Sequence, residues 1–260
     1  MTEAALCVIA ESPSRRETAQ IFAHNNKLPL LEARNPDCAL QLCYGDERIE
    51  LFDSKLNTGI YVDFVGGALA HRQQYGGGRG QAIAKAIGLK KGNTPSVLDV
   101  TAGLARDAYI LANLGCKISL VERSPVLYTL IEDGIRRGLE HESSKPVLEN
   151  FMNLINADAC LFMQHMPRDR LPDVIYIDPM YPERKKSALV KKDMQILQHL
   201  LGKDDDAASL LDTALNNATQ RVVIKRPIHA EAVSDIKPAT SISSKKTRYD
   251  IYLCHNKSES

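Results

Sequence analysis

Three acidic residues of this chain, Asp99, Glu122 and Asp178, each stand at the end of a short apolar run. Each run has the composition of a buried β-strand. In an open α/β sheet, nucleotides bind beyond the carboxyl ends of such strands, and an acid after the second strand accepts hydrogen bonds from ribose hydroxyls. Asp99 and Glu122 have the spacing that this geometry requires. The three positions therefore predict a nucleoside site lined by carboxylates.

Residues 97–123 supply the elements that would position two of these acids. A strand, a turn of small residues, an Ala- and Leu-rich helix ending near Cys116 and a second strand make up one βαβ unit. Gly103 is the only glycine of the turn, whereas the dinucleotide fingerprint needs three. This turn suits a nucleoside without a pyrophosphate, such as S-adenosylmethionine (SAM), better than NAD. The alternative is a structural βαβ unit without a ligand.

The third acid opens the segment Asp178-Pro179-Met180-Tyr181. This segment resembles the Asp-Pro-Pro-Tyr box of enzymes that methylate exocyclic amino groups of bases, with Met180 in place of the second proline. Such an amine is a poor nucleophile and needs placement more than a strong base. Asp178 and the Pro179 carbonyl can accept its two hydrogens while Tyr181 stacks on the base. The alternative for an Asp-Pro pair is a simple turn.

Basic residues gather near these elements. Lysines follow the Asp-Pro box, two cations precede Pro227, and two arginines accompany the glycine-rich segment 76–80. We expect them to contact RNA phosphates. The predicted contacts are Arg72, Arg79, Lys185, Lys186, Lys191, Lys192, Lys225 and Arg226. The alternatives are a solvated charged face and, for the glycines, a flexible connector.

The composition excludes several classes of protein. The chain has 260 residues, of which 44% are hydrophobic and 25% charged, as in an ordinary globular protein. No apolar run is long enough to span a membrane, and the N-terminus lacks the basic opening of a signal peptide, so we expect a cytoplasmic protein. The six cysteines form no C-x-x-C pair, which argues against a metal site and a disulfide framework. Because the net charge is only +1, any binding of nucleic acid must come from a local patch.

The region before residue 60 reads as a small α+β unit. Residues 5–10 form a predicted strand, a short helix runs to Phe22, and residues 40–44 and 49–52 alternate as a hairpin about Gly45-Asp46. No chemistry suggests itself in this region. We interpret it as a lid or docking module, with direct contact to a substrate as the alternative. Further strands are predicted near residues 153–159, 173–177, 221–227 and 249–253.

Several runs, taken together, resemble the bacterial RsmJ family. They are residues 62–72, 76–80, 99–107, 122–123, 178–180, 185–192, 222–227 and 249–252, in that order. The resemblance implies a SAM-dependent methyltransferase that acts on the N2 amine of one guanine in small-subunit ribosomal RNA. The partner would be that RNA or the small ribosomal subunit. The implied fold is α/β, with a Rossmann-like seven-stranded class I methyltransferase sheet and a small N-terminal α+β subdomain.

The resemblance also assigns residues to the cofactor. The family's contacts carry over to Arg106, Asp107, Glu122, Arg123, Asp158, Ala159 and Asp178. With Asp99 and Gly103 they form the predicted SAM site. Asp158 follows the predicted third strand, where nucleoside-binding sheets read the adenine amine, although a helix N-cap explains this residue equally well. We place the N-terminal subdomain and connector at residues 1–75 and the methyltransferase domain at residues 76–260.

Other classes of function compete with this prediction. A nicotinamide oxidoreductase would need the missing glycines. A DNA methyltransferase would share the Asp178 box but bring a separate target-recognition region, for which the chain has little room. A non-catalytic ribosome-binding factor would keep the basic residues without needing Asp99, Glu122 and Asp178 together. Methylation of another RNA or DNA base amine is the remaining alternative.

Overall fold

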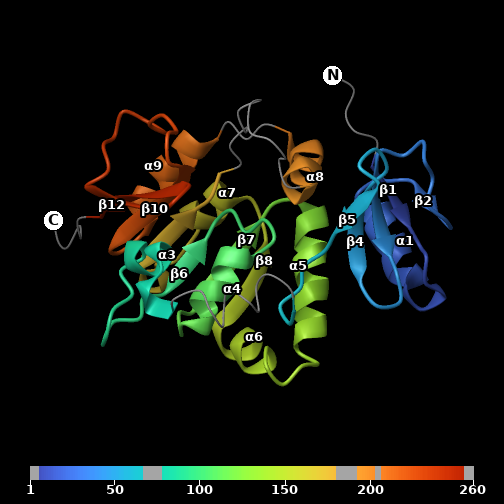
Figure 1. Ribbon diagram of the computed structural model, residues 1–260, viewed down its shortest axis with the longest axis horizontal. Coiled ribbons are helices and arrows are strands. Elements are labelled where there is room, and N and C mark those ends of the chain that lie inside the picture. Colours follow the sequence, from blue (N-terminus) through green and yellow to red (C-terminus); the bar gives the residue numbers. More distant parts are fainter. Residues whose placement is uncertain (1–5, 67–77, 180–191, 203–205, 255–260) are drawn as a thin grey trace. The chain divides into compact units, whose positions relative to one another are not determined.

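The structure is a computed structural model that describes residues 6–66, 78–179, 192–202 and 206–254 (Figure 1). The chain divides into two compact units. The first takes its residues from Met1–Val62, Ser124–Arg137 and Pro182–Lys203. The second takes them from Asp63–Arg123, Gly138–Tyr181 and Asp204–Ser260. The predicted boundary between residues 75 and 76 falls outside the described residues and stays a prediction.

The second unit is built on a seven-stranded sheet of order β11-β12-β10-β9-β6-β7-β8. The strands are β6 (Val97–Asp99), β7 (Ile118–Glu122), β8 (Met152–Asn156), β9 (Val174–Ile177), β10 (Arg221–Pro227), β11 (Thr240–Ser243) and β12 (Thr247–Leu253). All neighbours are parallel except β12, which runs antiparallel to β10 and β11. The predicted seven-stranded sheet is confirmed.

The strand order reverses between β6 and β9. From β6 the chain proceeds outward through β7 and β8, and then returns to place β9 and β10 on the other side of β6. In doubly wound sheets, ligands bind beyond the carboxyl ends of the strands at such a reversal. The topology therefore points to the ends of β6 and β9, where Asp99 is the last residue of β6 and Asp178 follows β9 directly.

Helices cover both faces of this sheet. They are α3 (Ala82–Ala86), α4 (Arg106–Asn113), α6 (Lys145–Phe151), α7 (Ala159–Gln164) and α9 (Ala207–Asn217), with short 3-10 turns at Gly78–Gly80 and Arg168–Arg170. Ile175 and Ile177 of β9 pack with α7 and α9 in one hydrophobic core cluster, while the Tyr176 hydroxyl between them donates to Asp107 of α4. Successive strand residues point to opposite faces, so β9 is buried on both sides and reads as a continuous apolar run.

The first unit holds a five-stranded sheet of order β2-β1-β3-β4-β5. The strands are β1 (Leu6–Ile9), β2 (Leu30–Leu31), β3 (Leu40–Tyr44), β4 (Ile49–Asp53) and β5 (Thr58–Ile60). β3 and β4 pair antiparallel about Gly45-Asp46, which confirms the predicted hairpin. The helices are α1 (Arg16–Asn25), α5 (Pro125–Gly138) and α8 (Lys192–Leu201), and α8 packs against β4 and β5. All but the last residue of α5 belongs to this unit.

A buried carboxylate ties α5 to the five-stranded sheet. The Asp133 side chain is only 2% exposed and accepts hydrogen bonds from Arg15 at 2.8 Å, Arg137 at 2.8 Å, Arg136 at 3.0 Å and the Ile49 amide at 3.0 Å. Burial alone would raise the pKa of Asp133, but these donors together hold it below its ordinary value. This group of residues, the Asp133 cluster, therefore fixes an ionised carboxylate inside the fold.

The cysteines behave as small apolar residues. All six are free, and Cys7, Cys38, Cys43 and Cys116 are buried. Burial raises the pKa of the Cys43 thiol to about 12, so the thiol stays protonated and unreactive at neutral pH.

Candidate active site

Four charged side chains meet the carboxyl-terminal edge of the parallel strands in the second unit. Asp99 ends β6 and Glu122 ends β7, while Asp178 follows β9 directly. The register places Asp99 beside Tyr176, two residues before Asp178, and Ile177 beside Ile224, one residue before Lys225. Pairing between strands thus brings residues more than 120 positions apart in the sequence to one edge.

Asp99 lies in a poor environment for a charge. It is 3% exposed, and its Oδ1 accepts a hydrogen bond from the Thr101 amide at 3.0 Å. Burial is the main reason that the pKa of Asp99 rises to about 7, and the carboxylates of Asp178, Asp107 and Glu122 add to the rise. A side chain in this position favours a ligand that brings a positive charge or hydrogen-bond donors.

Thr101 joins the ends of the two central strands. Its hydroxyl oxygen accepts a hydrogen bond from the Asp178 amide at 2.6 Å, and its own amide is the donor to Asp99. Sequence reasoning did not identify this residue. The sequence feature that could have identified Thr101 is its hydroxyl side chain two positions after the acid that ends a strand, an arrangement that is common in turns.

The turn after β6 depends on Gly103 and Glu122. Gly103 has φ +57°, in the left-handed region that glycine adopts at little cost. A Cβ there would meet only the Thr101 carbonyl, at 3.7 Å, so the backbone angle and not crowding favours glycine. The Gly103 amide donates to Oε2 of Glu122 at 3.0 Å. Glu122 therefore shapes the turn as well as ending β7.

Lys225 bridges two carboxylates. Its Nζ lies 2.6 Å from Asp178 Oδ2 and 2.8 Å from Asp107 Oδ2, and Asp107 Oδ2 also accepts the Tyr176 hydroxyl hydrogen at 2.9 Å. Burial would lower the pKa of Lys225, but the two carboxylates raise it above its ordinary value, so the lysine stays charged. The sequence predicted that Lys225 contacts an RNA phosphate. Because the structure pairs it with Asp178 and Asp107, we assign it to the Asp178 carboxylate instead.

Other predicted cofactor contacts lie around this edge. The Asp158 carboxylate accepts the Leu161 amide hydrogen at 2.9 Å and caps α7, which Ala159 begins. This confirms the N-cap alternative and leaves the adenine contact a prediction. Arg106 is exposed at the start of α4, and Arg123 is exposed and forms an ion pair with Asp206.

The predicted RNA contacts have different surroundings. Arg79 is exposed in the second unit and donates to the Lys90 carbonyl at 3.0 Å, and Lys192 is exposed in the first unit. Arg226 is 3% exposed and pairs with Asp250 at 3.3 Å, a position that offers no surface to a phosphate and speaks against the predicted contact. The remaining predicted residues lie outside the described part of the chain: Arg72, Tyr181, Lys185, Lys186 and Lys191.

The donor set at this edge fits SAM. Asp99, Asp107, Glu122 and Asp178 carry carboxylates, whereas Lys225 is the cation placed between two of them. This excess of negative charge suits a sulfonium and an ammonium group, and the carboxylates can accept hydrogens from ribose hydroxyls. Within the described residues no group of three or more histidine, cysteine or acidic side chains could hold a metal ion, and the expectation that no metal takes part stays a prediction.

Comparison with known proteins decides the family. A family profile described as "Putative SAM-dependent methyltransferase" matches residues 24–254. The chain belongs to this methyltransferase family. The expectation of SAM in place of NAD is thereby confirmed, and an oxidoreductase is excluded.

Relatives cover nearly the whole length of this family member. A protein from Aeromonas salmonicida and one from Yersinia enterocolitica, both named ribosomal RNA small subunit methyltransferase J, are 45% and 43% identical to it. These matches span 95% and 97% of this chain and 96% and 99% of the relatives. The predicted resemblance to that family is confirmed.

A solved structure agrees with this membership. The crystal structure of a SAM-dependent methyltransferase from Neisseria gonorrhoeae is 29% identical and covers 96% of each chain with a TM-score of 0.75. None of the helices that the structure describes has the length and apolar character needed to cross a membrane.

Proposed function

We propose that this enzyme transfers a methyl group from SAM to the N2 amine of a guanine in small-subunit ribosomal RNA. The names of its relatives support the RNA, and the resemblance to the RsmJ family supports the guanine and its N2 position. The observation that carries the chemistry is the Asp178 carboxylate, held by Lys225 at the edge where the strand order reverses.

The acids at this edge would hold the cofactor. Glu122 accepts hydrogen bonds from the ribose hydroxyls, and the Gly103 turn allows close approach of the ligand to the backbone. Asp99 would offer its carboxylate to a positively charged group of SAM. The other proposed contacts are Arg106, Asp107, Arg123, Asp158, Ala159 and Asp178. When bound, SAM supplies an electrophilic methyl group on a sulfonium sulfur.

Asp178 would position the target amine. Its carboxylate accepts one amine hydrogen, the Pro179 carbonyl accepts the other, and Tyr181 stacks on the base. As the nitrogen gains its methyl group it must lose one proton, and Asp178 is the proposed acceptor. Lys225 acts through Asp178: its contact at 2.6 Å fixes the direction of the carboxylate. Correct placement of this weak nucleophile is worth on the order of a hundredfold in rate.

RNA would be held by basic residues other than Lys225 and Arg226. We propose phosphate contacts by Arg72, Arg79, Lys185, Lys186, Lys191 and Lys192. The target base must leave its stack to reach Asp178, which costs a few kcal/mol that the phosphate contacts offset. Either free RNA or the small subunit is the substrate. Since ribosomal RNA is the proposed target, we propose that the enzyme acts in the cytoplasm.

Nucleoside analysis tests this proposal. Purified protein is incubated with SAM and with unmodified small subunits or their naked RNA, and the RNA is digested and examined by mass spectrometry. We expect N2-methylguanosine at one position. Methylated adenosine or cytidine, or no methylated nucleoside with either substrate, would contradict the proposal.

A further inference from the structure

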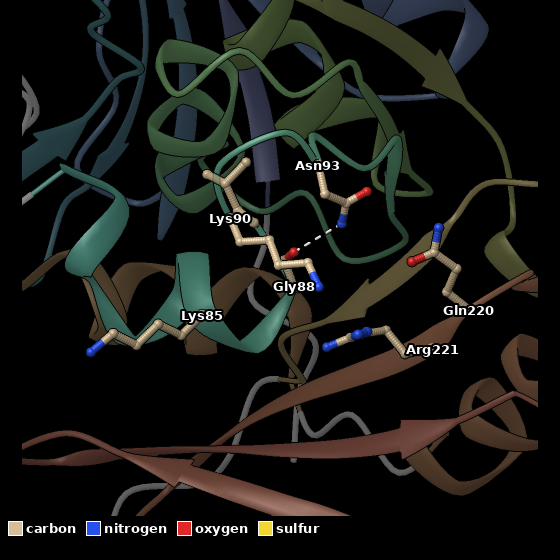
Figure 2. Close-up of a pocket in the computed structure, with 7 residues that line it drawn as sticks. Lys85, Gly88, Lys90, Asn93, Gln220 and Arg221 are labelled. Carbon is tan, nitrogen blue, oxygen red and sulfur yellow. Dashed lines mark hydrogen bonds between the residues drawn. The ribbon is translucent and has the colours of Figure 1, made fainter.

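A basic pocket lies in the second unit, away from the proposed active site. It has a volume of about 600 Å³, and its lining includes Lys85, Gly88, Lys90, Asn93, Gln220 and Arg221 (Figure 2). Arg221 begins β10, and Lys225 of the active site lies four residues further along this strand. At about 3.3 Å per residue, the backbone positions of Arg221 and Lys225 are about 13 Å apart along the strand. The pocket therefore lies toward the opposite edge of the sheet.

The charges of this basic pocket are of one sign. Three of its lining residues are cations and none is an acid. Among the described residues, no carboxylate forms an ion pair with Lys85, Lys90 or Arg221, whereas Lys225 at the other edge contacts two. Figure 2 shows the side chains of Lys90 and Arg221 extending toward the space beside Gly88, while Lys85 points away from it.

Arg221 is held in place with unused hydrogen-bonding capacity. Its Nη1 donates to the Ala86 carbonyl at 3.3 Å, but its Nε is buried and has no hydrogen-bond partner within the described part of the chain. The guanidinium packs so closely on Gly88 that a Cβ there would lie 2.9 Å from Cζ. Gly88 has φ +82°, which also favours glycine. The backbone thus makes room for the guanidinium group.

Asp173, which is hydrogen-bonded to the lining residue Gln220, is occupied by neutral donors. Asp173 accepts hydrogen bonds from Gln220 at 2.8 Å and from the Ser96 amide and hydroxyl, each at 2.9 Å. These hydrogen bonds satisfy the oxygens of the Asp173 carboxylate, so the cations of the basic pocket are not needed as its donors. The cations therefore remain available for an external anion.

We propose that the basic pocket binds a backbone phosphate of the RNA substrate, as a second contact outside the catalytic edge. This inference rests on the proposed function. Guanidinium and ammonium groups that form no ion pair with a carboxylate favour a phosphate, since Arg provides directed donors and Lys a compact charge. The second unit has further exposed cations near β6 in the sequence: Arg79 and Lys91 precede this strand, and Lys117 follows it. A free phosphorylated anion offers the same chemistry, so the test must separate the two sources.

The test compares two doubly substituted proteins. K85A/K90A removes two exposed cations that line the basic pocket, and K145A/K237A removes two exposed cations of the same unit that do not. Binding of small-subunit RNA is measured at several salt concentrations. We expect K85A/K90A to bind about tenfold more weakly and to flatten the slope of log affinity against log salt by about 1, with a much smaller change in the control.

Two further measurements fix the interpretation. SAM affinity and the identity of the methylated nucleoside should be the same in K85A/K90A as in the wild type, while the KM for RNA rises. Equal RNA binding by K85A/K90A and the control would overturn the proposal. Binding of inorganic phosphate that is lost in K85A/K90A, with RNA binding unchanged, would assign the basic pocket to a free anion and also overturn it. Failure of the proposed function shows separately, as absence of N2-methylguanosine from the wild-type reaction.

Discussion

Two buried carboxylates of this molecule have opposite surroundings. Asp133 in the first unit receives hydrogen bonds from three arginines and one amide, and its pKa lies below the ordinary value. Asp99 in the second unit is equally enclosed but has three acids near it, and burial raises its pKa to about 7. The same functional group is therefore stabilised as a charge in one unit and destabilised in the other.

The difference separates a structural role from a functional one. The Asp133 cluster satisfies its carboxylate with partners from the fold itself, so an additional ligand has little to offer there. At the edge of β6 and β9 the fold supplies four carboxylates and one well-placed lysine. Buried groups that are poorly compensated by the protein are frequent at functional sites. Substitutions in the two places should consequently change different properties.

The largest effect is expected in the Asp133 cluster. D133N leaves the partly buried Arg15 and Arg137 without their counter-charge inside the fold, which should lower the free energy of unfolding by about 3–5 kcal/mol. Urea unfolding at neutral pH measures this loss. Glu32→Gln provides the control, because the Arg16–Glu32 pair is exposed and contributes less than about 1 kcal/mol. Equal stability of D133N and the control would show that the cluster does not hold the first unit together.

At the functional edge the expected loss is in rate. Asp178→Ala should reduce methyl transfer on the order of a hundredfold, since the amine is no longer positioned. Lys225 retains Asp107 at 2.8 Å, so the fold should persist. Single-turnover assays with saturating SAM measure the rate, and urea unfolding checks stability. Near-normal transfer would mean that another residue places the target amine.

A tenfold effect on cofactor affinity is expected at Glu122. Glu122→Gln keeps an oxygen for the Gly103 amide but removes the negative charge that strengthens hydrogen bonds from ribose hydroxyls. The loss should be about 1.4 kcal/mol, measured by calorimetric titration with SAM. Unchanged affinity would remove Glu122 from the ribose site.

The smallest effect concerns the pH dependence of stability. Since the pKa of Asp99 is raised from 3.8 to about 7 by folding, the native state holds a proton that the unfolded state lacks between these values. Stability from this group is therefore greatest at low pH and falls as the pH rises. From pH 6 to pH 7 the wild type should lose about 1 kcal/mol relative to Asp99→Asn. Asp133 has the opposite sign, because its pKa is lowered and its contribution disappears as the pH falls.

Elements with a strong local pattern could be predicted from the sequence. The run before Asp178 is apolar because β9 is covered on both faces, and the alternation about Gly45-Asp46 marks a hairpin with one residue set on each face. The acids at or directly after the ends of β6, β7 and β9 could be predicted because each follows a short apolar run in the sequence. These features depend on neighbours in the chain, and each was found.

Features that depend on distant partners were missed. Lys225 looked like a surface cation because its partners Asp107 and Asp178 are 118 and 47 residues away, and Arg226 is buried against Asp250 across an antiparallel pair. The contribution of α5 to the first unit was also missed, since Asp133 meets Arg15 across 118 residues. A charge pattern in sequence does not reveal which charges will be paired in the fold.

The discontinuous first unit has a consequence for synthesis of the chain. Ile49 and Asp133, which are hydrogen-bonded in the finished protein, are 84 residues apart in the sequence. A ribosome that adds roughly 5–20 residues per second needs roughly 4–17 s to make this stretch. During that interval the nascent five-stranded sheet has no α5, and Arg15 has no Asp133. The N-terminal sheet therefore emerges first, but its unit is completed only after the first two strands of the other sheet have been made.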